Sequence, residues 1–341
     1  MANGSPPERT LRSVSELAAA GLLDESPELE AVARRYAVAV PPAMRALIAE
    51  AGDAIGRQFL PDAAELAAAS HERADPIGDE AFSPVKGLVH RYPDRALLKP
   101  LLACPVYCRF SFRREKVGRG EAMLDEAEIA AALAWIGGHF GIREVILSGG
   151  DCLLLSARRL GGLLARIAAI PHVELLRIHS RLPLADPKRV TPALANALGA
   201  VEKPLWLVVH ANHAAEFTPE GIAALDALRR AGLPLLGQSV LLRGVNDSAG
   251  ALADLFAAML RARVKPYYLH QLDAAPGTER FRVPIAQGQR LLAELRGRIS
   301  GMAWPTYVLD IPGGHGKVPI GPNYLEGETV RDPWGRTHPL P

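Results

Sequence analysis

The chain has 341 residues, of which 49% are hydrophobic and 22% charged, as is typical of a soluble globular protein with a sizeable core. Lysine and arginine (39) nearly balance aspartate and glutamate (37), so the net charge of +2 gives no electrostatic basis for nucleic acid or an acidic membrane surface as a partner. Three cysteines are too few for a secreted disulfide scaffold, and no signal peptide or membrane-spanning apolar run is found, so a cytoplasmic location is expected.

Residues 1–95 are predicted to form a helical extension followed by a linker. From residue 11 to about residue 70 the sequence has helical spacing and is interrupted at Pro41-Pro42 and at Pro61, which predicts three or four short helices. Residues 71–95 are polar and turn-rich, and they read as a linking segment. We interpret the helical part as a cap or an oligomerisation element, and we expect a homo-oligomer.

A strand-then-helix alternation repeats six times between residues 96 and 305. The predicted strands are 96–104, 144–148, 174–179, 204–210, 234–242 and 265–271. The predicted helices are 126–140, 156–170, 192–198, 219–231, 250–263 and 286–299. Short apolar strands between amphipathic helices predict an α/β fold, a partial (β/α)6 barrel of parallel strands. No GxGxxG motif follows the first strand, which argues against a Rossmann fold.

The end of the first predicted strand carries a candidate metal loop. Cys104 and Cys108 lie four residues apart among basic residues. A third cysteine three positions later would complete CxxxCxxC, a pattern that binds three irons of a 4Fe–4S cluster. That position is Ser111, whose hydroxyl is a harder and poorer iron ligand than a thiolate. Cys152 follows a different strand, and we interpret it as an incidental buried thiol.

Polar residues also follow the other five predicted strands. They occur in Ser148-Gly149-Gly150-Asp151, His179-Ser180-Arg181, His210-Ala211-Asn212-His213, Gln238-Ser239 and His270-Gln271-Leu272-Asp273. The two adjacent glycines allow a ligand to approach the backbone, and the aspartate after them can accept a hydrogen bond from an ammonium. Because an α/β barrel collects its catalytic loops at the carboxyl ends of its strands, we expect a ring of ligand-binding residues there.

The C-terminal segment, residues 306–341, begins with a strand that ends at Asp310. Three glycines within four residues then precede Lys317. One interpretation is a flexible loop with a surface lysine. The other is a lysine that reaches into the barrel mouth and forms a Schiff base with a carbonyl cofactor. The residues alone leave both interpretations open.

In this order, from about residue 90 to residue 324, these motifs resemble the lysine 2,3-aminomutase family of radical S-adenosylmethionine (SAM) enzymes. The motifs are HRYPDR, CxxxC-R-F-x-FRR, LSGGD, GQSVLLRGVND, KPYYLHQLD and LD-x-PGG-x-GK-x-P. The resemblance implies a 4Fe–4S cluster, SAM and pyridoxal 5′-phosphate (PLP) as cofactors. It also implies an isomerase that moves the amino group of L-lysine from C2 to C3, giving β-lysine, through a PLP aldimine and a 5′-deoxyadenosyl radical. An electron donor such as flavodoxin or ferredoxin is implied as a partner.

The resemblance assigns roles to individual residues. Lys317 matches the Schiff-base lysine, and Arg113 matches the arginine that pairs with the substrate carboxylate. Asp273 and Asp310 match the two carboxylates around the distal ammonium of the substrate. The residues implied to contact PLP are Arg91, Tyr92 and Arg95, those implied to contact SAM are Ser148, Gly149, Gly150, Asp151, His210 and Gln238, and those at cluster positions are Cys104, Cys108 and Ser111.

Several alternatives remain open at this stage. The paired aspartates favour free lysine as the substrate, and a branch that modifies a lysine destined for elongation factor P is the second interpretation. The serine at the third cluster position permits a third interpretation. In it the chain is a cluster-deficient homologue that binds PLP and SAM without radical chemistry. The cysteine-rich, zinc-binding extension of some clostridial members is missing, so no second metal is expected.

Overall fold

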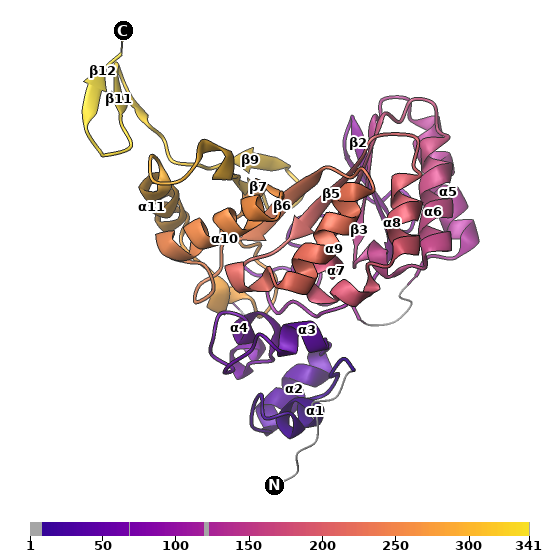
Figure 1. Cartoon of the computed structure of the whole chain (residues 1–341), viewed down its shortest axis with the longest axis horizontal. Helices are drawn as coiled ribbons and strands as arrows, with labels where there is room; N and C mark the ends of the chain where they lie inside the picture. The colour runs from indigo at the N-terminus through magenta and orange to yellow at the C-terminus, as the bar shows by residue number, and fades with distance from the viewer. Residues whose placement is uncertain (1–8, 68, 119–122, 341) are drawn as a thin grey trace.

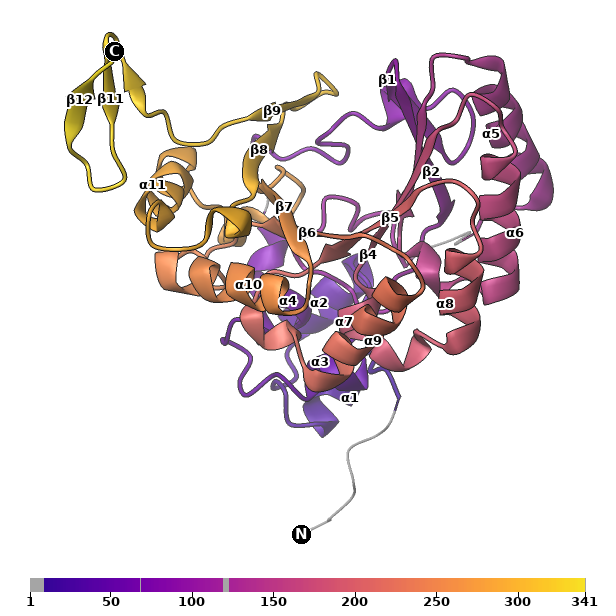
Figure 2. The ribbon, with the colours of Figure 1, turned by 45° about the horizontal axis from the view of Figure 1, so that its top comes forward.

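The computed structural model describes residues 9–67, 69–118 and 123–340, and its centre is one curled sheet (Figures 1 and 2). The sheet has nine strands in the order β1 to β9. Their bounds are β1 Leu88–Tyr92, β2 Arg95–Leu101, β3 Glu144–Gly149, β4 Leu175–Ser180, β5 Leu205–His210, β6 Leu235–Val240, β7 Lys265–His270, β8 Thr306–Asp310 and β9 Lys317–Pro319. Strands β2 to β8 run parallel, while β1 and β9 pair antiparallel at the two edges.

Helices connect the parallel strands and cover the outer face of the sheet (Figure 2). They are α5 Glu126–Gly138, α6 Ala157–Ala168, α7 Leu182–Ala185, α8 Pro192–Gly199, α9 Pro219–Arg230, α10 Ala249–Arg261 and α11 Ile285–Leu295. The long helices α5, α6, α9 and α10 each begin after an aspartate, serine or threonine whose side chain accepts a backbone hydrogen bond, which satisfies a donor that the first turn leaves free. Their apolar faces form one continuous core with the strands.

The predicted α/β partial barrel is confirmed, and each predicted strand and helix of the barrel is present within a few residues of its expected ends. The segment 71–95, expected to be a linker, contains strand β1, which pairs with β2. Only the first two residues of β1 are buried, so its half-exposed remainder reads as a polar loop in the sequence. The sheet thus begins before residue 96 and continues past residue 305, the limits expected for the barrel.

The N-terminal region forms the predicted short helices. They are α1 Val14–Ala19, α2 Pro27–Arg35, α3 Pro42–Arg45 and α4 Gly56–Phe59, followed by a 3-10 turn at Ala63–Leu66. Their apolar side chains share a buried cluster with Val106 of the cysteine loop and Ala185 of α7. The helices therefore pack against the cysteine loop at the carboxyl end of β2. Their expected role in oligomerisation stays a prediction.

A buried ion cluster connects this helical region to the cysteine loop. Glu65, in the 3-10 turn, is fully buried and accepts a hydrogen bond from Arg109 Nε at 3.0 Å. Arg114 also pairs with Glu65, and Arg280 lies 3.5 Å away from it on the connection after β7. Because buried charges require paired and hydrogen-bonded partners, this one carboxylate fixes the cysteine loop between two distant parts of the chain.

Beyond the barrel, three short strands form a separate exposed sheet (Figure 1). They are β10 Leu325–Glu326, β11 Thr329–Arg331 and β12 Thr337–Pro339. In the described part of the chain, no helix has both the length and the apolar character needed to cross a membrane.

Glu65→Gln is expected to lower the free energy of unfolding by about 3–5 kcal/mol, because it leaves buried arginines without their counter-charge. Urea unfolding followed by circular dichroism measures the change. Glu294→Gln is the control, because Glu294 forms an exposed pair with Arg298, and it should change stability by less than about 0.5 kcal/mol. Equal effects of the two substitutions would contradict the role assigned to the buried cluster.

Candidate functional site

A cavity of about 630 Å³ lies on the inner side of the curled sheet. It is bordered by residues along the strands and on the loops at their carboxyl ends, and it reaches Arg95, Glu144 and Thr306 at the amino ends of β2, β3 and β8. All sixteen site residues expected from the sequence border this one cavity, namely Arg91, Tyr92, Arg95, Cys104, Cys108, Ser111, Arg113, Ser148, Gly149, Gly150, Asp151, His210, Gln238, Asp273, Asp310 and Lys317. The cavity therefore brings together residues from every part of the barrel.

Lys317 lies at the border of this cavity because β9 pairs antiparallel with β8. The register places Lys317 directly opposite Asp310, and the ammonium of Lys317 forms an ion pair with that carboxylate. Its Nζ is also 3.2 Å from Nδ1 of His270, at the end of β7. The backbone N–H of Lys317 donates to the hydroxyl of Tyr92 at 2.8 Å. The lysine is thus held at the cavity, and the surface-loop interpretation of this residue is wrong.

The acidic side of the cavity contains two carboxylates with opposite pKa shifts. Burial, with the nearby charge of Asp310, raises the pKa of Asp273 to about 7. Burial also acts against ionisation of Asp310, but hydrogen bonds and charges from His270 and Lys317 lower its pKa to about 2. In the ligand-free protein Asp310 is therefore ionised and already paired, while Asp273 forms no ion pair with a side chain of residues 9–67, 69–118 or 123–340. A second ammonium in the cavity would supply the missing charge.

The basic side of the cavity is organised by Asp79, a residue that the sequence analysis did not single out. Its carboxylate accepts from Arg91 Nη2 at 3.1 Å and from Arg113 Nη2 at 2.9 Å. The Nε of Arg91 is buried and has no hydrogen-bond partner among the described residues. Arg95 also borders the cavity, and its guanidinium lies 3.7 Å from the centroid of the Tyr92 ring. These arginines and the lysine on β9 fit PLP, because they provide donors for a phosphate and an amine for a carbonyl carbon.

Two histidines present free ring nitrogens in the middle of the cavity wall. His179 Nδ1 lies 2.9 Å from the side-chain oxygen of Gln238. The Nε2 atoms of His179 and His210 are buried without a hydrogen-bond partner in the described structure. Burial lowers the pKa of both imidazoles well below the ordinary value, so both are neutral at pH 7. Free polar atoms of this kind fit SAM, which carries many hydrogen-bonding groups.

The Gly149-Gly150 motif after β3 lies close to the cysteine loop, a contact that we did not expect from the sequence. A Cβ on Gly150 would lie 2.2 Å from the carbonyl oxygen of Ala103, so the glycine is required by the close approach of the cysteine loop. The Asp151 carboxylate is buried and accepts from the Ser180 hydroxyl at 2.8 Å and from the backbone N–H of Arg181 at 2.8 Å. In this structure Asp151 therefore caps the chain after β4, and its expected contact with an ammonium stays a prediction.

The cysteine loop places two free thiols at the cavity. Cys104 and Cys108 border the cavity together with Ser111, whose Oγ accepts from the backbone N–H of Arg113 at 3.2 Å. Arg181 Nη1 donates to the Sγ of Cys108 at 3.3 Å. Across the described residues, no group of three or more histidine, cysteine, aspartate or glutamate side chains is placed to hold a metal ion. Two thiols and a hydroxyl do not match the three thiolates of a 4Fe–4S cluster.

Cys152 does not provide the third thiolate that the cysteine loop lacks. It is fully buried in the main apolar core, packed with the strands and helices around β3. This confirms its interpretation as a buried thiol.

Comparison with known proteins gives several related sequences. The family model described as lysine-2,3-aminomutase matches residues 292–331. The chain is 43% identical over 273 residues to the L-lysine 2,3-aminomutase of Acetoanaerobium sticklandii, covering 80% of this chain and 66% of that protein. It is 40% identical over 268 residues to the L-lysine 2,3-aminomutase of Escherichia coli, covering 79% of this chain and 78% of that protein.

The chain is also similar to a relative whose name gives a different amino acid. The glutamate 2,3-aminomutase of Clostridioides difficile is 36% identical over 254 residues, covering 74% of this chain and 60% of that protein. The chain spans less than two thirds of the length of the Acetoanaerobium and Clostridioides relatives. Overall similarity alone therefore does not identify the substrate, and the side chains of the cavity must be considered.

Asp273→Asn is expected to stabilise the cofactor-free protein increasingly as the pH rises from about 4 to 7. The pKa of Asp273 is raised from 3.8 to about 7, so its contribution to stability is fully present below pH 3.8 and is lost as the pH rises through 7. Denaturant unfolding at several pH values should show the stability difference between variant and wild type growing by up to about 1.4 kcal/mol per pH unit in that window. A difference independent of pH would contradict the raised pKa.

Proposed function

The chain belongs to the lysine 2,3-aminomutase family, and on that premise we propose that it is an isomerase that moves the amino group of L-lysine from C2 to C3 with PLP as cofactor. The observation that carries this proposal is the position of Lys317, between the arginines next to Tyr92 and the carboxylates of Asp273 and Asp310. One cavity thus offers an amine for the cofactor, cations for a carboxylate and a phosphate, and carboxylates for an ammonium.

The charges of the cavity favour one orientation of lysine. Its carboxylate would bind the guanidinium of Arg113, whose planar donors match a carboxylate in pairs. Its distal ammonium would lie at Asp273 and Asp310. A neutral side chain there would leave buried carboxylates unpaired, which costs several kcal/mol, so the site selects strongly for a cationic substrate.

In this proposal Asp310 pairs first with Lys317 and then with the distal ammonium of the substrate. In the ligand-free protein it pairs with the ammonium of Lys317. When bound, PLP supplies a carbonyl that links covalently to an amine and a π-system that stabilises reactive intermediates. Lys317 must lose a proton before its nitrogen can act as a nucleophile, and His270 Nδ1, 3.2 Å away, is placed to accept it. Burial and the charge of Lys317 lower the pKa of His270, so the ring is neutral in the ligand-free protein.

A second candidate function is favoured by one residue. Ser111 leaves the cysteine loop with two of the three family thiolates, and no described side chain replaces the third. In this alternative the protein binds PLP, SAM and lysine without radical chemistry. The two candidates share the PLP site and differ only at the cysteine loop, so separate experiments test each part.

Lys317→Ala is expected to abolish the imine absorbance that the wild-type protein develops with PLP, because the variant lacks the reacting amine. Absorbance spectra after removal of free PLP measure the adduct. Lys203→Ala is the control, since the Nζ of Lys203 binds the carbonyl of Ile170 outside the cavity, and it should match wild type. Identical spectra for wild type and Lys317→Ala would exclude the proposed cofactor site.

Ser111→Cys is expected to increase both the iron and sulfide content and β-lysine formation from L-lysine under anaerobic conditions. The substitution restores a thiolate where the loop has a hydroxyl. Cys152→Ser is the matched control, because its thiol is buried in the core, and it should leave the metal content unchanged. β-Lysine from the wild type at the level of Ser111→Cys would eliminate the second candidate, whereas no gain in iron or activity would contradict the assignment of this loop.

A further inference from the structure

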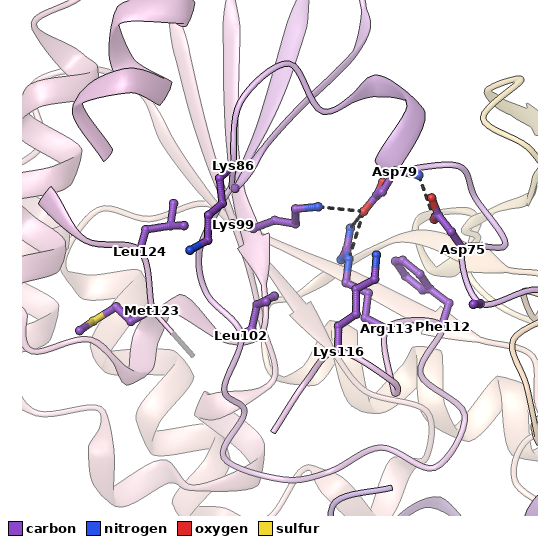
Figure 3. A pocket seen from close by; sticks show the side chains of 12 residues that line it. Asp75, Asp79, Lys86, Lys99, Leu102, Phe112, Arg113, Lys116, Met123 and Leu124 are labelled. Atoms are coloured by element: carbon purple, nitrogen blue, oxygen red, sulfur yellow. Dashed lines mark hydrogen bonds and ion pairs between the residues drawn. The ribbon is translucent and has the colours of Figure 1, made fainter. Parts of the chain in front are cut away.

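Asp79 is a buried carboxylate bound by three cations, and the function proposed above gives it no part in ligand binding. It is 5% exposed and lies just before a 3-10 turn at Glu80–Phe82. Its Oδ2 accepts from Arg113 Nε at 3.3 Å and Nη2 at 2.9 Å, and lies 3.5 Å from Lys99 Nζ (Figure 3). Its Oδ1 accepts from Arg91 Nη2 at 3.1 Å. Although burial opposes ionisation, Arg113 and Lys99 lower its pKa, so Asp79 is charged.

Asp79 and Arg113 stand between two cavities. Both border the main cavity, and both border a smaller one of about 140 Å³ (Figure 3). Lys99 approaches the carboxylate from the smaller cavity, whereas Arg91 borders the main one. The Asp79 carboxylate therefore binds cations that border either cavity.

The geometry leaves part of the Arg113 guanidinium available. Asp79 takes the edge formed by Nε and Nη2. A guanidinium has five N–H donors, and its second edge, formed by Nη1 and Nη2, can bind another carboxylate with two parallel hydrogen bonds. Arg113 can thus bind a ligand while it stays attached to Asp79. Three cations around one carboxylate also leave a net positive charge for anionic ligands.

The segment that carries Asp79 is itself firmly placed. The backbone N–H of Asp79 donates to Asp75 Oδ1 at 2.9 Å. A Cβ on Gly78 would lie 2.7 Å from the backbone of Gly313, and the N–H of Gly313 donates to the carbonyl of Pro76 at 3.2 Å. The segment therefore rests directly on the glycine loop that precedes Lys317. The position of the carboxylate is fixed relative to that lysine.

We propose that Asp79 is a positioning residue that holds Arg113 by one edge so that its other edge receives the carboxylate of the amino-acid substrate. This inference rests on the proposed function and deepens it. It assigns to Asp79 the discrimination between an amino acid and the corresponding simple amine. The opposing idea, that Asp79 competes with the substrate for Arg113, predicts the reverse effect of removing its charge.

The test compares L-lysine with 1,5-diaminopentane, which has the same two amines and lacks the carboxylate. Binding to the PLP-loaded protein is measured by the change in cofactor absorbance. Asp79→Asn should weaken lysine binding by about tenfold or more and leave diamine binding unchanged, because an unfixed guanidinium loses much of a charge-assisted contact. Asp79→Glu, which restores the charge, should recover much of the lysine affinity.

Two other results would overturn the proposal. Equal losses for lysine and the diamine indicate a general structural role, and tighter lysine binding indicates competition. Glu80→Gln is the neighbouring control, since Glu80 pairs with exposed Lys116, and it should change neither affinity. In an Arg113→Gln background, Asp79→Asn should cause no further loss of lysine affinity, and an additive loss would show that Asp79 acts elsewhere.

The same binding measurements give a different result if the proposed function itself is wrong. A wild-type protein that does not prefer lysine over the diamine contradicts the carboxylate role of Arg113, and this inference falls with it. A wild-type preference that Asp79→Asn retains in full contradicts this inference alone.

Discussion

The hydrogen bond from the backbone of Lys317 to the hydroxyl of Tyr92 links the two edges of the nine-stranded sheet. The partners are 225 residues apart, one at the end of β1 and the other at the start of β9. Because the sheet curls, its first and last strands meet at the cavity, and Arg91 of β1 and Arg95 of β2 border the same space as the carboxylates of Asp273 and Asp310. In a flat sheet these groups would lie at opposite edges, and no single ligand could contact both.

The cavity is organised for ligand binding at some cost to stability. Asp273 forms no ion pair within the described part of the chain, and desolvation together with the charge of Asp310 raises the pKa of its carboxyl group. On the opposite side, three cations surround Asp79. Unbalanced charges in a buried site destabilise the empty protein and become favourable when complementary charges arrive. The same charged side chains therefore favour ligand binding and lower the stability of the ligand-free protein.

The sequence predicted the repeating part of the fold well, because apolar strands and amphipathic helices have distinct periods and the carboxyl ends of parallel strands coincide. It did not predict β1, whose buried pair Leu88 and Val89 is too short to show a period. It also missed Asp79, which contacts Arg113 34 residues away, since nothing local marks a long-range ion pair. The sequence also did not show that Asp151 accepts a backbone hydrogen bond from Arg181, 30 residues away, and its expected contact with a ligand stays a prediction.

The central claim is that the cavity binds lysine in one orientation, with its carboxylate at Arg113 and its distal ammonium at Asp273 and Asp310. A crystal structure of the PLP-loaded protein with L-lysine tests this most directly. We expect the carboxylate within hydrogen-bond distance of Arg113 and the distal nitrogen between the two aspartates, with Lys317 withdrawn from Asp310. Lysine bound in the reverse orientation, or outside this cavity, would contradict it.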